Sequence, residues 1–362
     1  MGPISQTASV YLNFARWSGK SALVTGATGQ DGRYLVDLLC RHGYVVHAQT
    51  RGPTRTATDQ RIQWHIGDPA DGSFLENLII RTQPDEIYNL ASISRPTLSW
   101  AAPKETAEIN ALIPQQICEL LLKHRPQCRL FQASSSEIFG DGFSELQDEQ
   151  THCEPKTPYG VAKLYAHRII GAYRHQYGLH ACCGIMFNHE SPYRPLTFVT
   201  QKIAYAAANA SLGVMESAEL DERGRPILSG GKLLLGDLSV KRDFGFAGDY
   251  VEAMHLILQH PQPDDFVIGT GENHSVLDLC EAAFHAVGLD WTDYVGVDPK
   301  LIRRSDSRYT RANSVKLRAA CKWQPKVGFA ELVSIMVKAQ LERLQRDRQT
   351  YNAGLSVRPG DQ

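Results

Sequence analysis

The sequence predicts an α/β protein built on a doubly wound parallel sheet, with a second, smaller α/β domain. From residue 21 to about residue 187, short apolar runs alternate with longer amphipathic stretches. This rhythm is typical of parallel strands joined by crossover helices. A glycine-rich turn follows the first apolar run, and the alternation becomes less regular after residue 187. Right-handed crossovers in the first part therefore give a parallel sheet that is covered by helices on both faces.

The predicted strands and helices follow one another in the order that this fold requires. Strands are predicted at residues 21–25, 44–48, 62–66, 86–90, 129–132 and 181–187. Helices are predicted between them at residues 33–42, 74–81, 113–124 and 159–177. Farther along, the pattern predicts helices at residues 198–212 and 249–258 and an apolar run at 232–236, with a polar, exposed excursion at 214–230.

The composition excludes several classes of protein. With 43% hydrophobic residues among 362, the chain can bury a large core. Its 38 basic and 39 acidic residues give a formal net charge of −1, so no overall field attracts nucleic acid or an anionic membrane. We expect neither a signal peptide nor a membrane span. The eight cysteines show neither a C-x-x-C pair nor zinc-binding spacing, which predicts buried thiols, no metal and a reducing, cytoplasmic location.

The glycine-rich turn at residues 26–32 has the spacing of a pyrophosphate-binding turn. Gly26 permits the tight turn, Gly29 allows the backbone to approach a phosphate, and Gly32 lets the helix pack on the strand. An ordinary strand-to-helix turn is the alternative, but the position between the first strand and a helix is the context that the motif needs. We therefore predict a Rossmann-type dinucleotide site that includes the intervening Gln30 and Asp31.

The end of the second strand favours NADP over NAD. No acidic residue stands there to bind the ribose 2′-hydroxyl, and Arg51 lies where a 2′-phosphate is held. The alternative is a solvated surface arginine. Asp68, after the third strand, is placed to accept a hydrogen bond from the adenine amino group, although aspartate is also common in turns.

A tyrosine and a lysine lie one helical turn apart at the start of a predicted helix. The spacing of Tyr159 and Lys163 places the phenol and the ammonium group on one face. A nearby positive charge favours a phenolate, which makes the tyrosine a better base. In isolation, this spacing is more typical of an exposed helix.

A run of three serines and a glutamate at residues 134–137 ends the fifth strand. Its hydroxyl groups and the Glu137 carboxylate are expected to face the nicotinamide end of the cleft. A polar loop that caps a helix is the alternative. Together with the glycine turn and the pair Tyr159 and Lys163, in this order, the run indicates a catalytic site.

These residues together resemble the extended short-chain dehydrogenase/reductases, and longer strings resemble the GDP-mannose 4,6-dehydratase family within them. The strings are Gly-Gln-Asp-Gly-Arg-Tyr-Leu at 29–35, Gly-Val-Ala-Lys-Leu-Tyr-Ala-His at 160–167 and Phe-Asn-His-Glu-Ser-Pro at 187–192. Further matching strings extend the resemblance from about residue 21 to residue 344. The resemblance implies a lyase that forms the 4-keto-6-deoxy derivative of a GDP-sugar.

The resemblance also assigns catalytic roles. Tyr159 removes the proton from the sugar O4 as NADP⁺ accepts the C4 hydride, and Lys163 and Ser135 support the charges that develop. The resulting ketone acidifies the C5 hydrogen. Glu137 then removes that proton and assists the loss of the C6 hydroxyl as water, with Ser136 beside it, and the hydride returns to C6. Simple epimerases and reductases do not need this carboxylate.

Substrate contacts are likewise implied by the resemblance. Asn188, Lys202 and Arg242 are expected on the diphosphate and sugar side of the cleft, where cations suit a diphosphate. Arg303 and Asp306 are expected near the nucleotide. Surface charge is the alternative for the basic residues.

Some strings depart from the family pattern. Ala91, a cofactor-binding candidate, opens a loop that continues with Arg95 and Pro96, where the family has small and apolar residues. A second departure replaces an Arg-Pro-Thr-Glu-Val-Asp pattern at residues 303–308, and the excursion at 214–230 is longer than in relatives. The substrate is therefore GDP-mannose, GDP-heptose or another nucleotide sugar. A C4 reductase or epimerase and a non-catalytic NADP-binding module are further alternatives.

The chain divides into predicted regions accordingly. Residues 1–18 form an N-terminal extension, and residues 19–193 form the NADP-binding domain, to which segments at about 239–272 return. Residues 194–345 mainly form the sugar-nucleotide-binding domain, and residues 346–362 form a polar tail. The resemblance implies a homo-oligomer, either a dimer or a tetramer; the tetramer is less expected, because only Arg51 stands where relatives carry two adjacent arginines.

Overall fold

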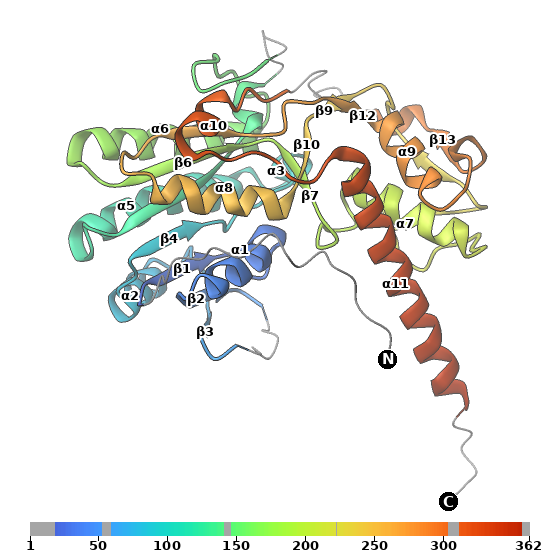
Figure 1. Ribbon diagram of the computed structural model, residues 1–362, viewed down its shortest axis with the longest axis horizontal. Coiled ribbons are helices and arrows are strands. Elements are labelled where there is room, and N and C mark those ends of the chain that lie inside the picture. The colour runs from blue at the N-terminus through green and yellow to red at the C-terminus, as the bar shows by residue number, and fades with distance from the viewer. Residues whose placement is uncertain (1–18, 53–58, 141–145, 222, 303–310, 357–362) are drawn as a thin grey trace, which may run out of the picture.

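A seven-stranded parallel sheet forms the larger lobe of the computed structural model (Figure 1). The structure describes residues 19–52, 59–140, 146–221, 223–302 and 311–356. The strands lie in the spatial order β11 (Asp265–Ile268), β6 (Ala181–Met186), β5 (Arg129–Ser135), β4 (Glu86–Asn89), β1 (Ser21–Thr25), β2 (Val45–Thr50) and β3 (Ile62–Ile66). The chain leaves β1 toward β2 on one side and returns to β4 on the other, so the order reverses at β1. This is the doubly wound topology that the sequence predicts.

Helices cover both faces of this sheet. On one face, α1 (Gln30–Arg41) and α8 (Ala247–Gln259) pack against each other and share one apolar core with the strands. On the other face, α2 (Gly72–Thr82), α5 (Ile113–His124) and α6 (Pro158–Tyr177) enclose a second core. The α1 helix begins at Gln30, three residues before the predicted start, because Gly29 already serves as its N-cap.

Short elements connect these helices and strands. They are α3 (Pro96–Ser99), α4 (Pro103–Ala107), the π-helix η1 (Glu108–Leu112), the 3₁₀ turn η2 (Ser136–Phe139) and α10 (Val315–Cys321). The first three lie consecutively between β4 and α5, so the chain after β4 borders the site through α3 before it returns to the sheet face.

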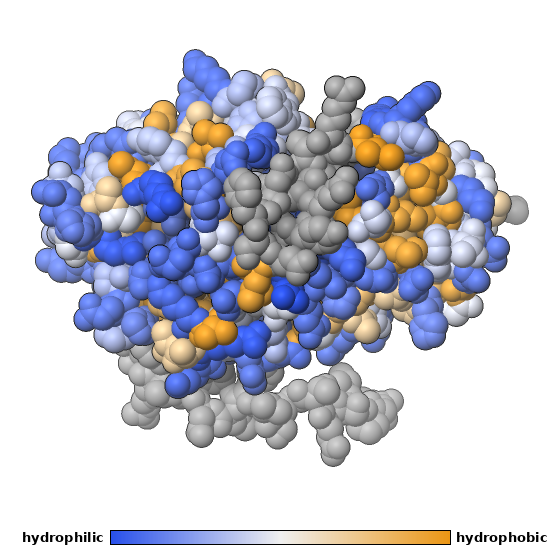
Figure 2. Space-filling model, turned by 90° about the horizontal axis from the view of Figure 1, so that it is seen from above, coloured by the Kyte–Doolittle hydropathy of each residue, from blue (hydrophilic) through white to orange (hydrophobic). Residues whose placement is uncertain are grey.

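A smaller lobe forms around its own apolar core. Its helices are α7 (Val199–Ser211), α9 (Val276–His285) and α11 (Phe329–Ser356), with the 3₁₀ turns η3 (Trp291–Asp293) and η4 (Pro299–Leu301). Its strand pairs are β8 (Leu233–Leu235) with β13 (Val295–Val297) and β9 (Lys241–Arg242) with β12 (His274–Ser275). A third pair, β7 (Asn188–Glu190) with β10 (Phe244–Phe246), joins the two lobes. Figure 2 shows more apolar side chains on this face of the smaller lobe than on that of the larger one.

Two segments that are polar in sequence are not simply exposed chain. The excursion at 214–230 exposes Met215 and Leu220 but returns to the core of the smaller lobe at Ile227 and Leu228. The α11 helix continues to Ser356 and so includes the first part of the polar segment at 346–362. The division into four regions stays a prediction.

The thiols are unpaired, as the cysteine pattern predicts. All eight cysteines are free, and six of them are buried. Among the helices that the structure describes, none combines the length and apolar character that a bilayer crossing requires.

A buried carboxylate ties the start of the sheet to α8. Glu86 is fully buried at the start of β4 and accepts hydrogen bonds from Tyr44 at 3.0 Å and Tyr88 at 2.8 Å. Lys20 at 3.1 Å and Gln259 at 3.0 Å also donate to it. One carboxylate therefore satisfies donors from three strands or strand ends and one helix.

Glu86→Ala should lower the free energy of unfolding by about 3–5 kcal/mol, because it removes a buried carboxylate that accepts from two buried tyrosines and pairs with Lys20. Urea denaturation monitored by circular dichroism measures this change, with the exposed Glu281→Ala as the control. A loss no larger than that of the control would show that the Glu86 cluster contributes little to stability.

Candidate functional site

Three adjoining cavities lie along the carboxyl ends of the central strands. The glycine-turn cavity is lined by residues that include Gly26, Thr28, Gly29, Gln30, Asp31, Gly32, Gln49, Arg51, Asp68, Ala91, Ser92 and Arg194. The central cavity is lined by residues that include Asp31, Ser92, Pro96, Ser134, Ser135, Ser136, Glu137, Tyr159, Lys163, Asn188, His189 and Arg194. The outer cavity is lined by residues that include Arg95, Pro96, Trp100, Glu137, Asn188, Glu190, Phe198, Leu235, Asp237, Arg242, Val276 and Leu301.

The cavities share walls and so form one path. Asp31 and Arg194 line both the glycine-turn and the central cavity. Pro96, Glu137 and Asn188 line both the central and the outer cavity. A long ligand can therefore extend from the glycine turn through the serine run to the smaller lobe. Such a cleft at the carboxyl ends of parallel strands, beside a reversal of strand order, is where ligands bind in this class of fold.

The glycine turn has the backbone that its sequence requires. Gly26 has a φ of +66°, a conformation that favours glycine, and it packs against the backbone of Ala91. A Cβ atom on Gly32 would lie 2.5 Å from the Gly26 carbonyl oxygen, so helix and turn can approach this closely only without a side chain. Gln49 accepts a hydrogen bond from the Gly26 amide at 3.0 Å and thereby holds the turn.

Arg51 and Asp68 lie together at the far end of the glycine-turn cavity. The Arg51 guanidinium and the Asp68 carboxylate are 4.0 Å apart, and both side chains are about half exposed. Such a pair is weak in water, so the guanidinium remains able to turn toward an anion. Eight of the predicted cofactor residues thus line one cavity, while Tyr159 and Lys163, which are predicted to contact the cofactor as well, line the central one.

Tyr159 and Lys163 lie on the buried start of α6. The Thr157 side chain caps this helix by accepting a hydrogen bond from the Gly160 amide at 3.0 Å, and the residue after the cap is Pro158. The Lys163 ammonium group donates to the Ala133 carbonyl at 2.9 Å and lies 5.7 Å from the centroid of the Tyr159 ring. Both side chains line the central cavity.

Burial shifts the two groups in opposite directions. It raises the pKa of Tyr159 to about 12, which a hydrogen bond with Ser135 opposes and the charge of Glu137 reinforces. It lowers the pKa of Lys163 to about 8, against the attraction of Asp31. Each shift favours the uncharged form, because the site removes water from both groups.

The serine run turns from β5 into η2. The Ser135 hydroxyl accepts a hydrogen bond from the Glu137 amide at 3.3 Å, which fixes the turn. Ser135 and Ser136 are buried, whereas Glu137 is partly exposed and lines both the central and the outer cavity. A carboxylate therefore lies between the Tyr159 side of the site and the outer cavity.

Only some of the predicted substrate-binding residues lie together in the structure. Asn188 and Arg242 line the outer cavity, and Arg242 donates a hydrogen bond to the Lys241 carbonyl at 2.8 Å. Lys202 lies on α7 and is not among the described residues that line the three cavities. Arg303 and Asp306 lie outside the described residues.

A buried ion pair at the glycine turn is not apparent from the sequence. The His189 Nε2 atom lies 3.0 Å from the Asp31 carboxylate, and its Nδ1 atom lies 2.7 Å from the Phe187 carbonyl. Both nitrogens therefore face acceptors, which favours the doubly protonated ring. Burial lowers the pKa of His189, but Asp31 more than compensates and raises it above the usual value. The His189 ring stacks on Tyr250 with the centroids 4.6 Å apart.

The contacts of the predicted cofactor residue Gln30, and Arg194 as a whole, are not apparent from the sequence. Gln30 does more than line its cavity, because its amide donates to the His189 carbonyl at 3.0 Å and accepts from Ser191 at 2.9 Å. Arg194 is ion-paired with Glu190 at 3.1 Å and lies over the Phe198 ring. Its place between two cavities gives a fixed cation beside the turn. For Arg194, the only signal in the sequence is its position just after the matching string at 187–192.

The family of the chain follows from comparison with known proteins. Residues 23–336 match the GDP-mannose 4,6 dehydratase family. The chain belongs to this family. It is 37% identical over 353 residues to GDP-mannose 4,6 dehydratase 1 of Arabidopsis thaliana, covering 92% of this chain and 93% of that protein. It is 35% identical over 361 residues to GDP-mannose 4,6 dehydratase of Homo sapiens, covering 90% and 92%. The predicted GDP-mannose 4,6-dehydratase resemblance is confirmed.

Solved structures share the fold at low sequence identity. A dTDP-glucose 4,6-dehydratase from Bacillus anthracis in complex with NAD superposes with a TM-score of 0.75 at 21% identity, covering 90% of this chain and 98% of that one. RMD from Pseudomonas aeruginosa complexed with NADPH superposes with a TM-score of 0.73 at 21% identity, covering 90% and 100%. These structures confirm the predicted α/β fold.

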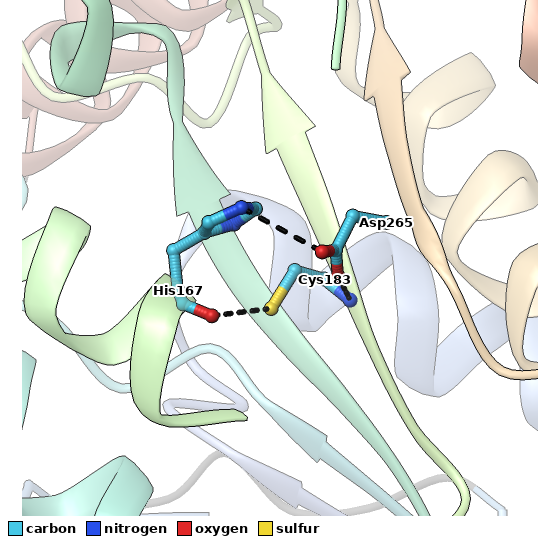
Figure 3. Close-up of side chains that lie close together, drawn as sticks. All are labelled: His167, Cys183 and Asp265. Atoms are coloured by element: carbon cyan, nitrogen blue, oxygen red, sulfur yellow. Dashed lines mark hydrogen bonds and ion pairs between the residues drawn. The ribbon is translucent and has the colours of Figure 1, made fainter. Parts of the chain in front are cut away.

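One cluster outside the site contains side chains that commonly bind metals. His167, Cys183 and Asp265 bring potential ligand atoms within 4.8 Å of one another (Figure 3). The Asp265 carboxylate is already paired with Arg174 and accepts a hydrogen bond from the Cys183 amide at 3.2 Å. Burial raises the pKa of the Cys183 thiol well above its usual value, so the metal-binding thiolate is disfavoured. The geometry thus favours a polar contact between α6, β6 and β11.

The Asp31–His189 pair predicts a pH-dependent contribution to stability. Because the pKa of His189 is raised from about 6.5, the pair stabilises the fold fully below about pH 6.5 and less as the pH rises through the folded-state pKa. His189→Gln should therefore lower the free energy of unfolding by about 2 kcal/mol near pH 6 and by less near pH 9.

Chemical denaturation at several pH values measures this difference. The exposed His285→Gln serves as the control, since it removes an imidazole without a buried partner. A loss that is the same at both pH values would mean that His189 acts only through packing against Tyr250.

Proposed function

We propose that this protein is an NADP-dependent lyase that converts GDP-mannose, or a closely related GDP-sugar, into its 4-keto-6-deoxy derivative. Membership of the GDP-mannose 4,6 dehydratase family supports the reaction class. The observation that carries the proposal is the position of Glu137, which lies at the junction of the central and outer cavities, close to the hydroxyl of Ser135 and the phenol of Tyr159.

The glycine-turn cavity fits a dinucleotide. Gly26 and Gly32 leave room that a Cβ atom would fill, and the N-terminus of α1 opens beside them, so backbone amides can bind a pyrophosphate. Arg51 at the end of β2 favours a 2′-phosphate and hence NADP. When bound, NADP⁺ accepts a hydride from the sugar and later returns it, so no net oxidation occurs.

Tyr159 is the group that takes the proton from the sugar O4. Its pKa of about 12 means that the free side chain is a phenol at neutral pH, so the proton transfer depends on neighbouring positive charge and on hydrogen bonds in the closed site. Lys163 supplies that charge while it is protonated, which its pKa of about 8 allows at neutral pH. Ser135 donates to the oxygen that develops at C4.

Glu137 serves the elimination step. Once C4 is a ketone, the hydrogen on C5 is acidic, and the Glu137 carboxylate removes it as a proton. The C6 hydroxyl then leaves, and the proton that Glu137 has gained passes to it, so that water departs and a C5–C6 double bond forms. Ser136, buried beside Glu137, can hold the departing oxygen. One carboxylate is thus both base and acid, and when the hydride returns to C6 a proton adds to C5, which balances the proton that Tyr159 removed from O4.

The nucleotide is expected to extend into the outer cavity. Asn188 and Arg242 line it and suit the diphosphate, while Leu235, Val276 and Leu301 offer an apolar surface for a base. Lys202 stays a candidate that acts from α7. GDP-heptose or another nucleotide sugar is the second substrate candidate, because Arg95 adds a cation to the same cavity. The homo-oligomer and the cytoplasmic location stay predictions.

Glu137→Gln should abolish water loss while leaving NADP⁺ binding unchanged, because the amide keeps the shape of the side chain but cannot take the C5 proton. Mass spectrometry of GDP-mannose incubated with NADP⁺ and the wild type should show a product that lacks one water without net cofactor reduction. The variant should form it at least about a hundredfold more slowly.

The exposed Glu331→Gln is the control and should keep full turnover. Turnover by Glu137→Gln at the wild-type rate would refute the proposed mechanism. If the wild type leaves GDP-mannose intact, GDP-heptose is the next substrate. Isomerisation without loss of mass would identify an epimerase instead, and consumption of NADPH in a separate incubation with a 4-keto nucleotide sugar would identify a reductase.

Tyr159→Phe should reduce turnover by about a thousandfold or more, because the variant has no group that can take the O4 proton. Tyr165→Phe, on the exposed side of the same helix, is the matched control and should retain activity. Fluorescence titration with NADPH should give similar affinities for both variants. Equal activity of the two variants would exclude Tyr159 as the base.

A further inference from the structure

Arg95 differs from the other arginines of the site in lacking an acceptor. Arg194 is paired with Glu190, Arg51 lies 4.0 Å from Asp68, and Arg242 donates to a carbonyl. The Arg95 side chain forms neither a hydrogen bond nor an ion pair with any residue that the structure describes. It is nevertheless partly buried in the wall of the outer cavity. A guanidinium that loses water without gaining an acceptor is unfavourable, so this position suits a ligand.

The backbone holds Arg95 at this wall. It is the N-cap of α3, and the proline that follows fixes the first turn of this short helix. Thr97 and Trp100 of the same segment also line the outer cavity. The α3 helix packs on α6, which carries Tyr159. The cation is therefore placed by the same framework that places the proposed base.

The neighbours of Arg95 indicate which part of a nucleotide sugar it meets. Pro96 and Glu137 line both the central and the outer cavity, whereas Arg95 and Arg242 line only the outer one. In the proposed reaction, the sugar must reach Tyr159 and Glu137, and the diphosphate is attached to its opposite end, at C1. Arg95 lies next to a residue of the junction, and Arg242 comes from β9 in the smaller lobe. The sugar is therefore expected to lie at Arg95 and the diphosphate at Arg242.

We propose that Arg95 is a specificity-determining residue that binds two neighbouring oxygen atoms of the sugar. The planar guanidinium presents parallel N–H groups, which match vicinal hydroxyl groups in a way that an ammonium group does not. This assignment rests on the proposed function, because it takes the position of the sugar from the roles of Tyr159 and Glu137. On this assignment, Arg95 favours GDP-sugars whose adjacent hydroxyl groups reach the wall of the outer cavity at the start of α3.

Binding measurements on the full chain with NADP⁺ present test the assignment. The ligands are GDP, GDP-mannose and GDP-heptose, and the proteins are the wild type, Arg95→Ala, Arg95→Lys and Arg41→Ala. Arg41 is a matched control on α1, where it pairs with Asp37 at the surface. Isothermal titration calorimetry gives each dissociation constant, and NADPH replaces NADP⁺ for any ligand that is turned over, because the reduced cofactor cannot accept the C4 hydride.

Arg95→Ala should weaken the most tightly bound GDP-sugar about tenfold or more, which corresponds to about 1.4 kcal/mol, and should change the affinity for GDP by less than about twofold. Arg95→Lys should bind the GDP-sugar about as weakly as Arg95→Ala does, because one ammonium group cannot replace the paired N–H donors of the guanidinium. Arg41→Ala should bind every ligand like the wild type.

Other results overturn the assignment. Equal weakening of GDP and GDP-sugar by Arg95→Ala would place Arg95 on the diphosphate, and unchanged affinity for every ligand would remove its role. In either case, normal formation of the dehydrated product by the wild type would leave the proposed function standing. If the wild type binds GDP but no GDP-sugar, the proposed function and the role of Arg95 both fail.

Discussion

The parallel alignment of β1, β4, β5 and β6 is the constraint on which the site depends. Parallel strands end at one edge of the sheet, so segments that follow them meet there although they are far apart in sequence. The glycine turn follows β1, the Arg95 segment follows β4, the serine run ends β5, and Asn188 follows β6. The hydrogen bonds of Thr25 to the amides of Leu90 and Ala91, at 3.0 and 3.1 Å, hold the first two of these ends together.

The Asp31–His189 pair links the glycine-turn side of the cleft to β7. Asp31 belongs to the start of α1, and His189 belongs to β7, which pairs with β10 at the border of the smaller lobe. Since both ring nitrogens face acceptors, the position of β7 is coupled to that of the glycine turn. The pair thus joins the glycine turn to the strand that carries Asn188, which lines the central and outer cavities.

Local patterns made most of the fold predictable. The period of the apolar residues gave every strand of the first half to within a few residues, and the Thr157 cap followed by Pro158 fits the predicted start of α6. The glycine turn, Arg51, Asp68, Tyr159, Lys163 and the serine run were recognisable because their spacing in sequence reflects a local geometry. The structure gathers these residues around two adjoining cavities.

Contacts between distant segments were not predictable in the same way. Nothing in the spacing of Asp31 and His189 shows that they meet, since they are separated by 158 positions. Arg194 is an ordinary cation in sequence, and only the fold places it between two cavities. Lys202 shows the reverse case: its family string is present, yet on α7 it is not among the residues that line the three described cavities. A motif thus identifies a residue type, while the packing of its element decides what that residue can reach.

The same burial that shapes the central cavity also sets its chemistry. Burial raises the pKa of Tyr159 and lowers that of Lys163, so the site favours the uncharged form of each group. Proton transfer from a sugar hydroxyl then depends on the positive charge that Lys163 still carries at neutral pH. A polar site built to pair with such ligands rejects analogues that leave its groups unpaired, and it does so more strongly than an apolar pocket rejects a change of size. The partly buried guanidinium of Arg95 extends this logic to the sugar: a ligand that fails to supply acceptors leaves this cation unpaired in the wall of the outer cavity and therefore binds more weakly.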